Sequence, residues 1–316
     1  NLDSEDEGTI FVGCAGGGDS SLNLPITRRP APDGFVSRTL KVAGLLGGHS
    51  GLDIAKAHGN AIKVLARALA AGGILDGGVL LSCIEGGSKR NAIPRESSAC
   101  IWMAPDRLPA FQEAISDFQA LIRTELGKAD PGVELTIVDA HCTDTPITQG
   151  ATLVRLLLAL PHGPLVMNQD LIGLVDTSTN LAIVGIEGDT AKVLCNSRSS
   201  VASAMESVRQ GMKAAVELAG GTAELFGQYP GWRPNLDSKI LAVAKAVWHE
   251  RTGKDPEVTA IHAGLECGVI GERAPGMDTI SFGPDIRGAH SPDERVSIPS
   301  TGRFYDYLKA ILAKVA

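Results

Sequence analysis

Hydrophobic and polar positions along the chain follow two different periods, and the changes between them mark the predicted elements. Residues 35–46 mix β-branched and apolar side chains and predict a strand. Residues 52–71 repeat apolar side chains every three to four positions, which predicts a helix that ends at Gly72. Residues 78–84 and 96–103 predict two further strands.

The pattern continues with a second helix and more strands. Asp106 can cap a helix whose apolar stripe runs to Ile122, and residues 133–139 predict a strand after it. This part of the chain therefore has the order strand–helix–strand–strand–helix–strand, which is typical of an α+β layer. Further along, residues 181–198 predict a hairpin and residues 200–219 a long helix.

The end of the chain has a pattern of its own. The segment 228–235 is rich in proline and glycine and predicts a domain boundary. The residues beyond it predict an α/β arrangement, with a helix at 237–251, strands at 257–261 and 277–282, and a closing helix near 301–314.

Composition narrows the class of protein. The chain has 316 residues, of which 44% are hydrophobic, so it can form one large domain or two ordinary ones. The net charge of −7 argues against nucleic acid or an anionic membrane as the main partner. No apolar run reaches the length of a membrane span, and no signal-peptide pattern is visible. The six cysteines are scattered, which indicates reduced thiols and a cytoplasmic protein.

Glycine clusters and histidines are the first candidates for chemistry. The clusters at 13–18 and 44–51 lack the spacings of nucleotide-binding loops, and we expect tight turns there. His49, His262 and His290 each lie in a glycine-bearing turn at the end of a predicted element, where functional residues concentrate.

Asp3 has a similar position, in an acidic cluster just before the strand-like run at 9–14. Two interpretations are open for it. It is either part of a solvated acidic turn or, together with an imidazole, a ligand of a divalent metal ion.

Six ordered motifs identify a family. They are "NLDSEDEG…GCAGG", "GLLGGHSGLDI…GNA", "EGGSKRNAIPRE", "YPGWRPN", "IHAGLECG" and "GAHSPDERV". Together they resemble the bacterial aminoacyl-histidine (Xaa-His) dipeptidases, within the large family of di-zinc aminopeptidases, dipeptidases and aminoacylases. The chain departs from that pattern at two places. Ser88 and Lys89 stand where Thr-Leu is usual, and Asn196 and Ser197 stand where apolar residues are usual.

The resemblance implies a fold and a division into domains. In this family an α/β catalytic domain of the zinc-peptidase type is interrupted by an inserted α+β lid domain, through which two subunits associate. We therefore expect residues 1–18 and 231–316 to form a partial catalytic domain and residues 19–230 to form the lid. We also expect the N-terminal part of the catalytic domain to be absent from this chain.

The resemblance also implies roles for individual residues. Asp3 would ligate one of two zinc ions and His290 the other, while the remaining ligands and the general-base glutamate belong to the absent part. His49 would reach from a partner subunit into the active site and stabilise the developing oxyanion. The substrate would be held by Asn91, Arg198 and Glu266.

The resulting hypothesis is zinc-dependent hydrolysis of dipeptides with a C-terminal histidine. We expect a metallo-dipeptidase that works as a cytoplasmic homodimer, with this chain as an incomplete and inactive portion. Other divalent metals are possible in place of zinc. Two alternatives remain open: a non-catalytic dimerisation or binding module, and a related enzyme that deacylates N-acyl amino acids.

Overall fold

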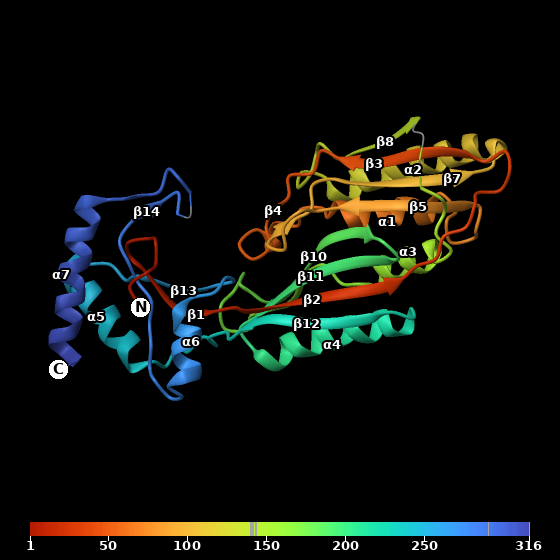
Figure 1. The fold of residues 1–316 in the computed structure, drawn as a ribbon. Helices are drawn as coiled ribbons and strands as arrows, with labels where there is room; N and C mark the ends of the chain where they lie inside the picture. The colour runs from red at the N-terminus through yellow and green to blue at the C-terminus, as the bar shows by residue number, and fades with distance from the viewer. Residues whose placement is uncertain (140–141, 143, 290, 316) are drawn as a thin grey trace.

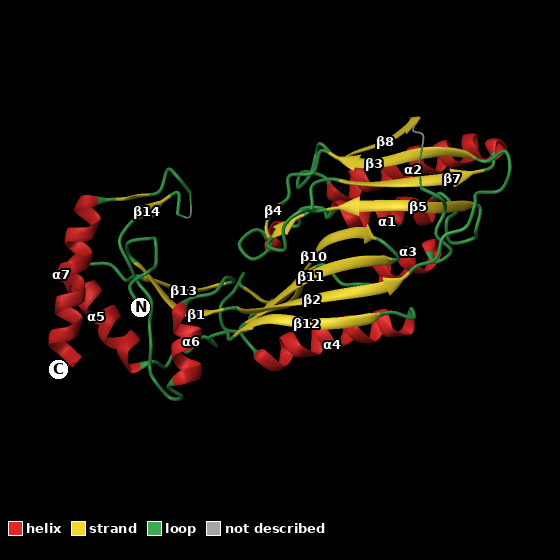
Figure 2. Cartoon of the chain, viewed as in Figure 1, coloured by secondary structure: helices red, strands yellow, loops and turns green. Residues whose placement is uncertain are grey.

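The chain forms two units of unequal size, which lie side by side in Figure 1. The computed structural model describes residues 1–139, 142, 144–289 and 291–315. Figure 2 shows that helices and strands are mixed in both units. The mixed α/β fold class predicted from the sequence is thus confirmed.

The smaller unit is built from both ends of the chain. Strand β1 (Thr9–Cys14) pairs in parallel with β13 (Glu257–Ile261). Apolar side chains from this sheet and from two helices form its core, among them Ile10, Val12, Leu241 and Ile311. The helices and the short hairpin of this unit are α5 (Lys239–Thr252), α6 (Glu266–Arg273), α7 (Ile298–Val315), β14 (Ile286–Arg287) and β15 (Arg295–Val296).

The larger unit is one antiparallel sheet in two halves. Among the described residues its strand order is β12-β2-β11-β10-β5-β7-β3-β8, with β9 paired to β10 outside this path. The first half contains β3 (Val36–Ala43), α1 (Ala61–Ala71), β5 (Val79–Gly86), β7 (Ser97–Met103), α2 (Leu108–Leu126) and β8 (Glu134–Asp139). The second contains β2 (Gly16–Pro25), α3 (Gly150–Ala159), β9 (Gly163–Met167), β10 (Val175–Glu187), β11 (Thr190–Ser199), α4 (Ala202–Leu218) and β12 (Thr222–Tyr229).

The two halves repeat the same order of elements. Apart from β9, each runs strand–helix–strand–strand–helix–strand, and β5 of the first half meets β10 of the second at the centre of the sheet. The first half is inserted into the second, after β2. The sequence analysis recognised this order only in the first half, because the insertion separates β2 from the rest of its own repeat.

The helices cover one face of the large sheet, as Figure 1 shows. Side chains alternate between the two faces of a strand, so Val193 and Cys195 of β11 join the helix-facing core. Asn196 and Arg198 therefore point to the opposite face, and Asp19 lies beside Asn196 on β2. These polar side chains are nevertheless buried. Short loops cover them, and the candidate site is built there.

Several predicted elements are confirmed and three are wrong. The strand at 257–261 and the helix near 237–251 are present. The helix predicted at 52–71 starts only at Ala61, because the Asn60 side chain caps it by accepting hydrogen bonds from the amides of residues 62 and 63. The predicted strand at 277–282 is reduced to a single bridge at Ser281.

The glycine cluster at 13–18 is the third wrong prediction, since it leads into strand β2 instead of a tight turn. A methyl group on Gly16 would lie 2.4 Å from the Gly231 nitrogen, and one on Gly17 would lie 2.5 Å from the Tyr229 ring. Glycine is required here because neighbouring segments approach the strand closely. Strand β2 already belongs to the large sheet at Gly16. The exact domain limits given above stay a prediction.

Candidate functional site

Three of the basic side chains singled out in the sequence meet at the covered face of β11. They come from the short strand β4 (Gly48–His49), from β11 itself and from the loop after β13. Gly51 lies among them: a methyl group on it would be 3.2 Å from His49 Cε1, 3.3 Å from Arg198 Nε and 2.4 Å from the carbonyl oxygen of His262. The structure thus brings His49, Arg198 and His262 of one chain together.

Arg198 is a buried cation with neutral partners. Only 6% of the Arg198 surface is exposed to solvent. Nη1 donates to the hydroxyl of Tyr229 at 3.0 Å, and Nη2 donates to Oγ of Ser50 at 3.4 Å. Nε has no hydrogen-bond partner, and no ion pair joins Arg198 to a carboxylate among the described residues. A buried guanidinium with a donor left over suits an anionic ligand, above all a carboxylate.

His49 is held as a neutral imidazole with a defined tautomer. Its Nδ1 accepts hydrogen bonds from the amides of Gly51, at 3.2 Å, and Leu52, at 3.1 Å. Burial lowers the pKa of His49, and the nearby Arg198 lowers it further, while Asp53 acts in the opposite direction. The proton of the neutral ring must therefore be on Nε2, which makes that nitrogen a hydrogen-bond donor.

His262 connects the smaller unit to the large sheet. It is 6% exposed, and its Nε2 lies 2.7 Å from the hydroxyl of Ser178 on β10. Burial lowers its pKa to about 4, with a further contribution from Arg198. The imidazole is therefore neutral at physiological pH.

A pH dependence of stability follows from this pKa. As the pH falls from about 6.5 to about 4, the unfolded chain binds a proton at His262 and the folded chain does not. We expect the free energy of unfolding to fall over this range by up to about 3 kcal/mol from His262 alone. Urea unfolding of wild type and of His262→Gln at several pH values measures it. Equal slopes for the two proteins would contradict the prediction.

Asn91 and Glu266, predicted to hold substrate, are both exposed. Asn91 adjoins β6 (Ala92–Ile93), which pairs with β4, and its carbonyl accepts the amide of Ser50 at 2.9 Å. Asn91 therefore lies next to the turn that carries His49. Glu266 begins α6 and accepts a hydrogen bond from Nδ2 of Asn1 at 2.9 Å. It is thus near the N-terminal segment that contains Asp3.

The predicted metal ligands are placed only in part. Asp3 is exposed, in a segment anchored by the amide of Ile286, which donates to the Glu5 carbonyl at 2.9 Å. His290 lies outside the described residues. Within the described ranges there is no group of three or more histidine, cysteine, aspartate or glutamate residues that could hold a metal ion. An exposed carboxylate suits a zinc ligand, but Asp3 alone is not a metal site.

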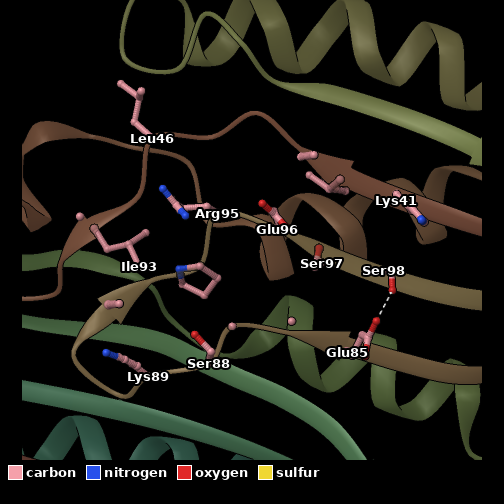
Figure 3. A pocket seen from close by; sticks show the side chains of 17 residues that line it. Lys41, Leu46, Glu85, Ser88, Lys89, Ile93, Arg95, Glu96, Ser97 and Ser98 are labelled. Atoms are coloured by element: carbon pink, nitrogen blue, oxygen red, sulfur yellow. Dashed lines mark hydrogen bonds between the residues drawn. The ribbon is translucent and has the colours of Figure 1, made fainter.

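A separate pocket is lined in part by residues of β4 and β6 (Figure 3). Its volume is about 780 Å³, and it is lined by both cations and anions, including Lys41, Arg95 and Glu85. Glu85 accepts a hydrogen bond from Ser98 at 2.9 Å. None of the predicted site residues that the structure describes lines this pocket. We prefer the Arg198 cluster as the candidate site because, among the described residues, only there is a buried cation left without an anion.

The sequence analysis missed several residues of this cluster. Ser50, Ser178 and Tyr229 all contact its basic groups, yet serine and tyrosine carry no local signal of such a role. Tyr229 was visible only as the first residue of the motif "YPGWRPN".

Comparisons with known proteins find similarity along the whole chain. A family model described as a peptidase dimerisation domain matches residues 40–130, which is most of the first half of the large sheet.

No helix in the described part of the chain has the length and apolar character needed to cross a membrane.

Two relatives are similar over nearly the full chain. The cytosol non-specific dipeptidase of Escherichia coli strain K12 is 37% identical over 319 residues, a match that covers 100% of this chain and 65% of the relative. This chain superposes on the crystal structure of aminoacylhistidine dipeptidase from Vibrio alginolyticus with a TM-score of 0.94 and 38% sequence identity. The match covers 99% of this chain and 64% of the Vibrio chain. This chain spans less than two thirds of the length of either relative.

Proposed function

We propose that the chain belongs to the M20 peptidase family and is the larger part of a zinc-dependent dipeptidase that hydrolyses Xaa-His dipeptides, in line with its similarity to two dipeptidases and to a peptidase dimerisation domain. The two relatives described above are named as dipeptidases, one of them as an aminoacylhistidine dipeptidase. The single observation that carries the proposal is the buried Arg198 guanidinium, which has an unused donor and no carboxylate partner in the described structure.

Arg198 is proposed to bind the C-terminal carboxylate of the dipeptide. A guanidinium can donate two parallel hydrogen bonds to a carboxylate, which fixes the direction of the bound peptide as well as its affinity. Asn91, which is exposed beside the His49 turn, would contact the peptide backbone. Glu266, which contacts Asn1, is proposed to hold the substrate from the side of the metal ligands.

His49 is proposed to stabilise the negative oxygen that develops on the scissile carbonyl. A neutral imidazole with its proton on Nε2 can donate to that oxygen without giving up the proton. The family resemblance implies that His49 acts in the active site of a partner subunit. In this structure His49 is next to Arg198 of its own chain, and we propose that the two residues serve the same active site, that of the partner subunit.

Asp3 and His290 are proposed to hold the metal, together with ligands from a segment that precedes this chain in the complete protein. A pair of metal ions, when bound, lowers the pKa of a water molecule and polarises the scissile carbonyl. We propose zinc as the metal, residues 1–18 and 231–316 as part of the catalytic domain, and residues 19–230 as the lid. A cytoplasmic homodimer that associates through the lid completes the proposal, in line with the match to a peptidase dimerisation domain.

The test uses the complete protein, meaning this chain together with the preceding segment. Alanyl-histidine hydrolysis should be abolished by a metal chelator and restored by zinc, whereas N-acetyl-histidine should not be cleaved. The 316-residue chain alone is expected to be inactive, because the resemblance assigns the other ligands and the base to residues outside it. Cleavage of N-acetyl amino acids would favour a deacylase, and dimerisation without any hydrolysis would favour a non-catalytic module.

A further inference from the structure

A second layer of buried polar residues lies beneath the Arg198 cluster. Asp19 on β2 and Asn196 on β11 are opposite each other in the sheet. Asp19 is 1% exposed and Asn196 is 7% exposed. Asn196 stands where the family resemblance leads one to expect an apolar residue, and a buried amide needs hydrogen-bond partners to offset the loss of water.

The partners of Asn196 fix its orientation. Its Nδ2 donates to Oδ1 of Asp19 at 2.7 Å. An ionised carboxylate only accepts hydrogen bonds, so the amide nitrogen must face Asp19 and the amide oxygen must face the other way. That oxygen accepts a hydrogen bond from the hydroxyl of Ser50 at 3.4 Å. The carboxylate thus determines which way the amide points, and the amide determines where the Ser50 proton lies.

Ser50 passes this orientation on to the candidate site. With its proton directed at Asn196, its oxygen has lone pairs free to accept Nη2 of Arg198, at 3.4 Å. The Ser50 amide also donates to the Asn91 carbonyl at 2.9 Å. Ser50 is 1% exposed and directly follows His49. Ser50 therefore connects three parts of the site: it follows His49, its amide bonds the loop of Asn91, and its hydroxyl accepts from the guanidinium of Arg198.

Asp19 also holds the Asn91 loop from its other side. Its Oδ2 accepts a hydrogen bond from Nη1 of Arg90 at 2.8 Å. Nδ2 of Asn180 donates to the Ala92 carbonyl at 2.8 Å, which fixes the loop beyond Asn91. Residues from β2, β10 and β11 thus converge on the two loops that cover the site.

We propose that Asn196, oriented by Asp19, is a positioning residue that sets the affinity of the site for the substrate carboxylate, by holding Ser50 and through it Arg198. This inference rests on the proposed function of Arg198. Asn196 itself does not reach the substrate, and its effect is expected in KM more than in kcat.

The first experiment compares Asn196→Leu with wild type in the complete protein. The leucine has nearly the same size but cannot bond to Ser50 or Asp19, so KM for alanyl-histidine should rise about tenfold. The KM for alanyl-histidine amide, which has no carboxylate, should change little. Thr179→Val is the control, because Thr179 is also buried, lies on the neighbouring strand and bonds the Ser197 hydroxyl on the helix-facing side. Its contact with Asn196 is to the backbone carbonyl, at 3.5 Å, and not to the side chain. Thr179→Val should alter stability without altering KM.

A charge exchange tests the same contact without changing its volume. Asn196→Asp places two carboxylates against each other and should raise KM at least as much as Asn196→Leu. The double variant Asp19→Asn with Asn196→Asp again has one carboxylate and one amide, and should recover most of the wild-type affinity. A double variant no better than Asn196→Asp would overturn the proposal.

A further measurement is independent of catalysis. Hydrogen exchange of the Ser50 amide should be faster in Asn196→Leu than in wild type or in Thr179→Val. Unchanged exchange together with unchanged KM overturns the inference while leaving the proposed function intact. Failure of the wild-type protein to hydrolyse alanyl-histidine would instead contradict the proposed function, and the exchange rates alone would then decide whether Asn196 holds the Ser50 turn.

Discussion

Replacing His49 with alanine in the complete protein is expected to lower kcat for alanyl-histidine by roughly 10²–10³-fold, the loss found when one preorganised donor to an oxyanion is removed. KM should change little, because the donor acts mainly in the transition state. Thermal stability should also change little, since His49 is only partly buried and its Nδ1 contacts lie within its own turn. A stability loss that matches the activity loss would mean that His49 only shapes the turn.

Subunit mixing shows in which active site His49 acts. If His49 acts in the active site of the partner, mixtures of His49→Ala with His290→Ala subunits should show more activity than the two variants separately, because one site then combines an intact metal ligand with an intact His49. No recovery would mean that His49 acts in the active site of its own chain. His290→Ala removes a predicted metal ligand and leaves the His49 turn intact in sequence. Recovery of activity in the mixture would place His49 in the active site of the partner, as the family resemblance implies.

Replacing Arg198 with methionine is expected to lower kcat/KM for alanyl-histidine by roughly 10²–10³-fold. The reason is that a buried charged pair with the substrate carboxylate is lost, an effect of about 2–5 kcal/mol in comparable complexes. Hydrolysis of alanyl-histidine amide should be much less affected. Equal losses for the dipeptide and its amide would argue against carboxylate binding by Arg198.

Replacing the buried Arg198 and replacing the buried Arg209 should change the free energy of unfolding differently. Arg198 has only hydroxyl partners, so Arg198→Met should leave the free energy of unfolding unchanged or raise it. Arg209 is 2% exposed and donates to the Asp19 and Phe226 carbonyls and to Gln228, with Glu206 at 3.6 Å. Arg209→Met is therefore the matched control, and it should destabilise the protein. Chemical unfolding of both variants measures the contrast.

Local sequence patterns predicted those elements whose structure is decided by their own residues. Strand 257–261 and the helix that follows Asp106 have clear periods and are present in the structure. The patterns failed where a distant segment decides the conformation. Gly16 and Gly17 look like turn residues, but Gly231 and Tyr229 pack so closely against them that only glycine fits in the strand. The predicted helix at 52–71 failed for a local reason, since Asn60 caps a helix that begins later.

The sequence by itself determined the fold class, the family and the identities of the basic residues at the candidate site. These follow from local periodicity and from motifs that can be read in order along the chain. Only the tertiary structure decided which residues surround them. Ser50 and Arg198 are 148 positions apart, and Asp19 and Asn196 are 177 positions apart. Strand pairing brings Asp19 and Asn196 together, and the turn after β4 packs on the sheet so that Ser50 meets Arg198. The physical reason is that a hydrogen bond depends on where two side chains lie in space, and strand pairing between distant segments fixes those positions whereas local propensity does not.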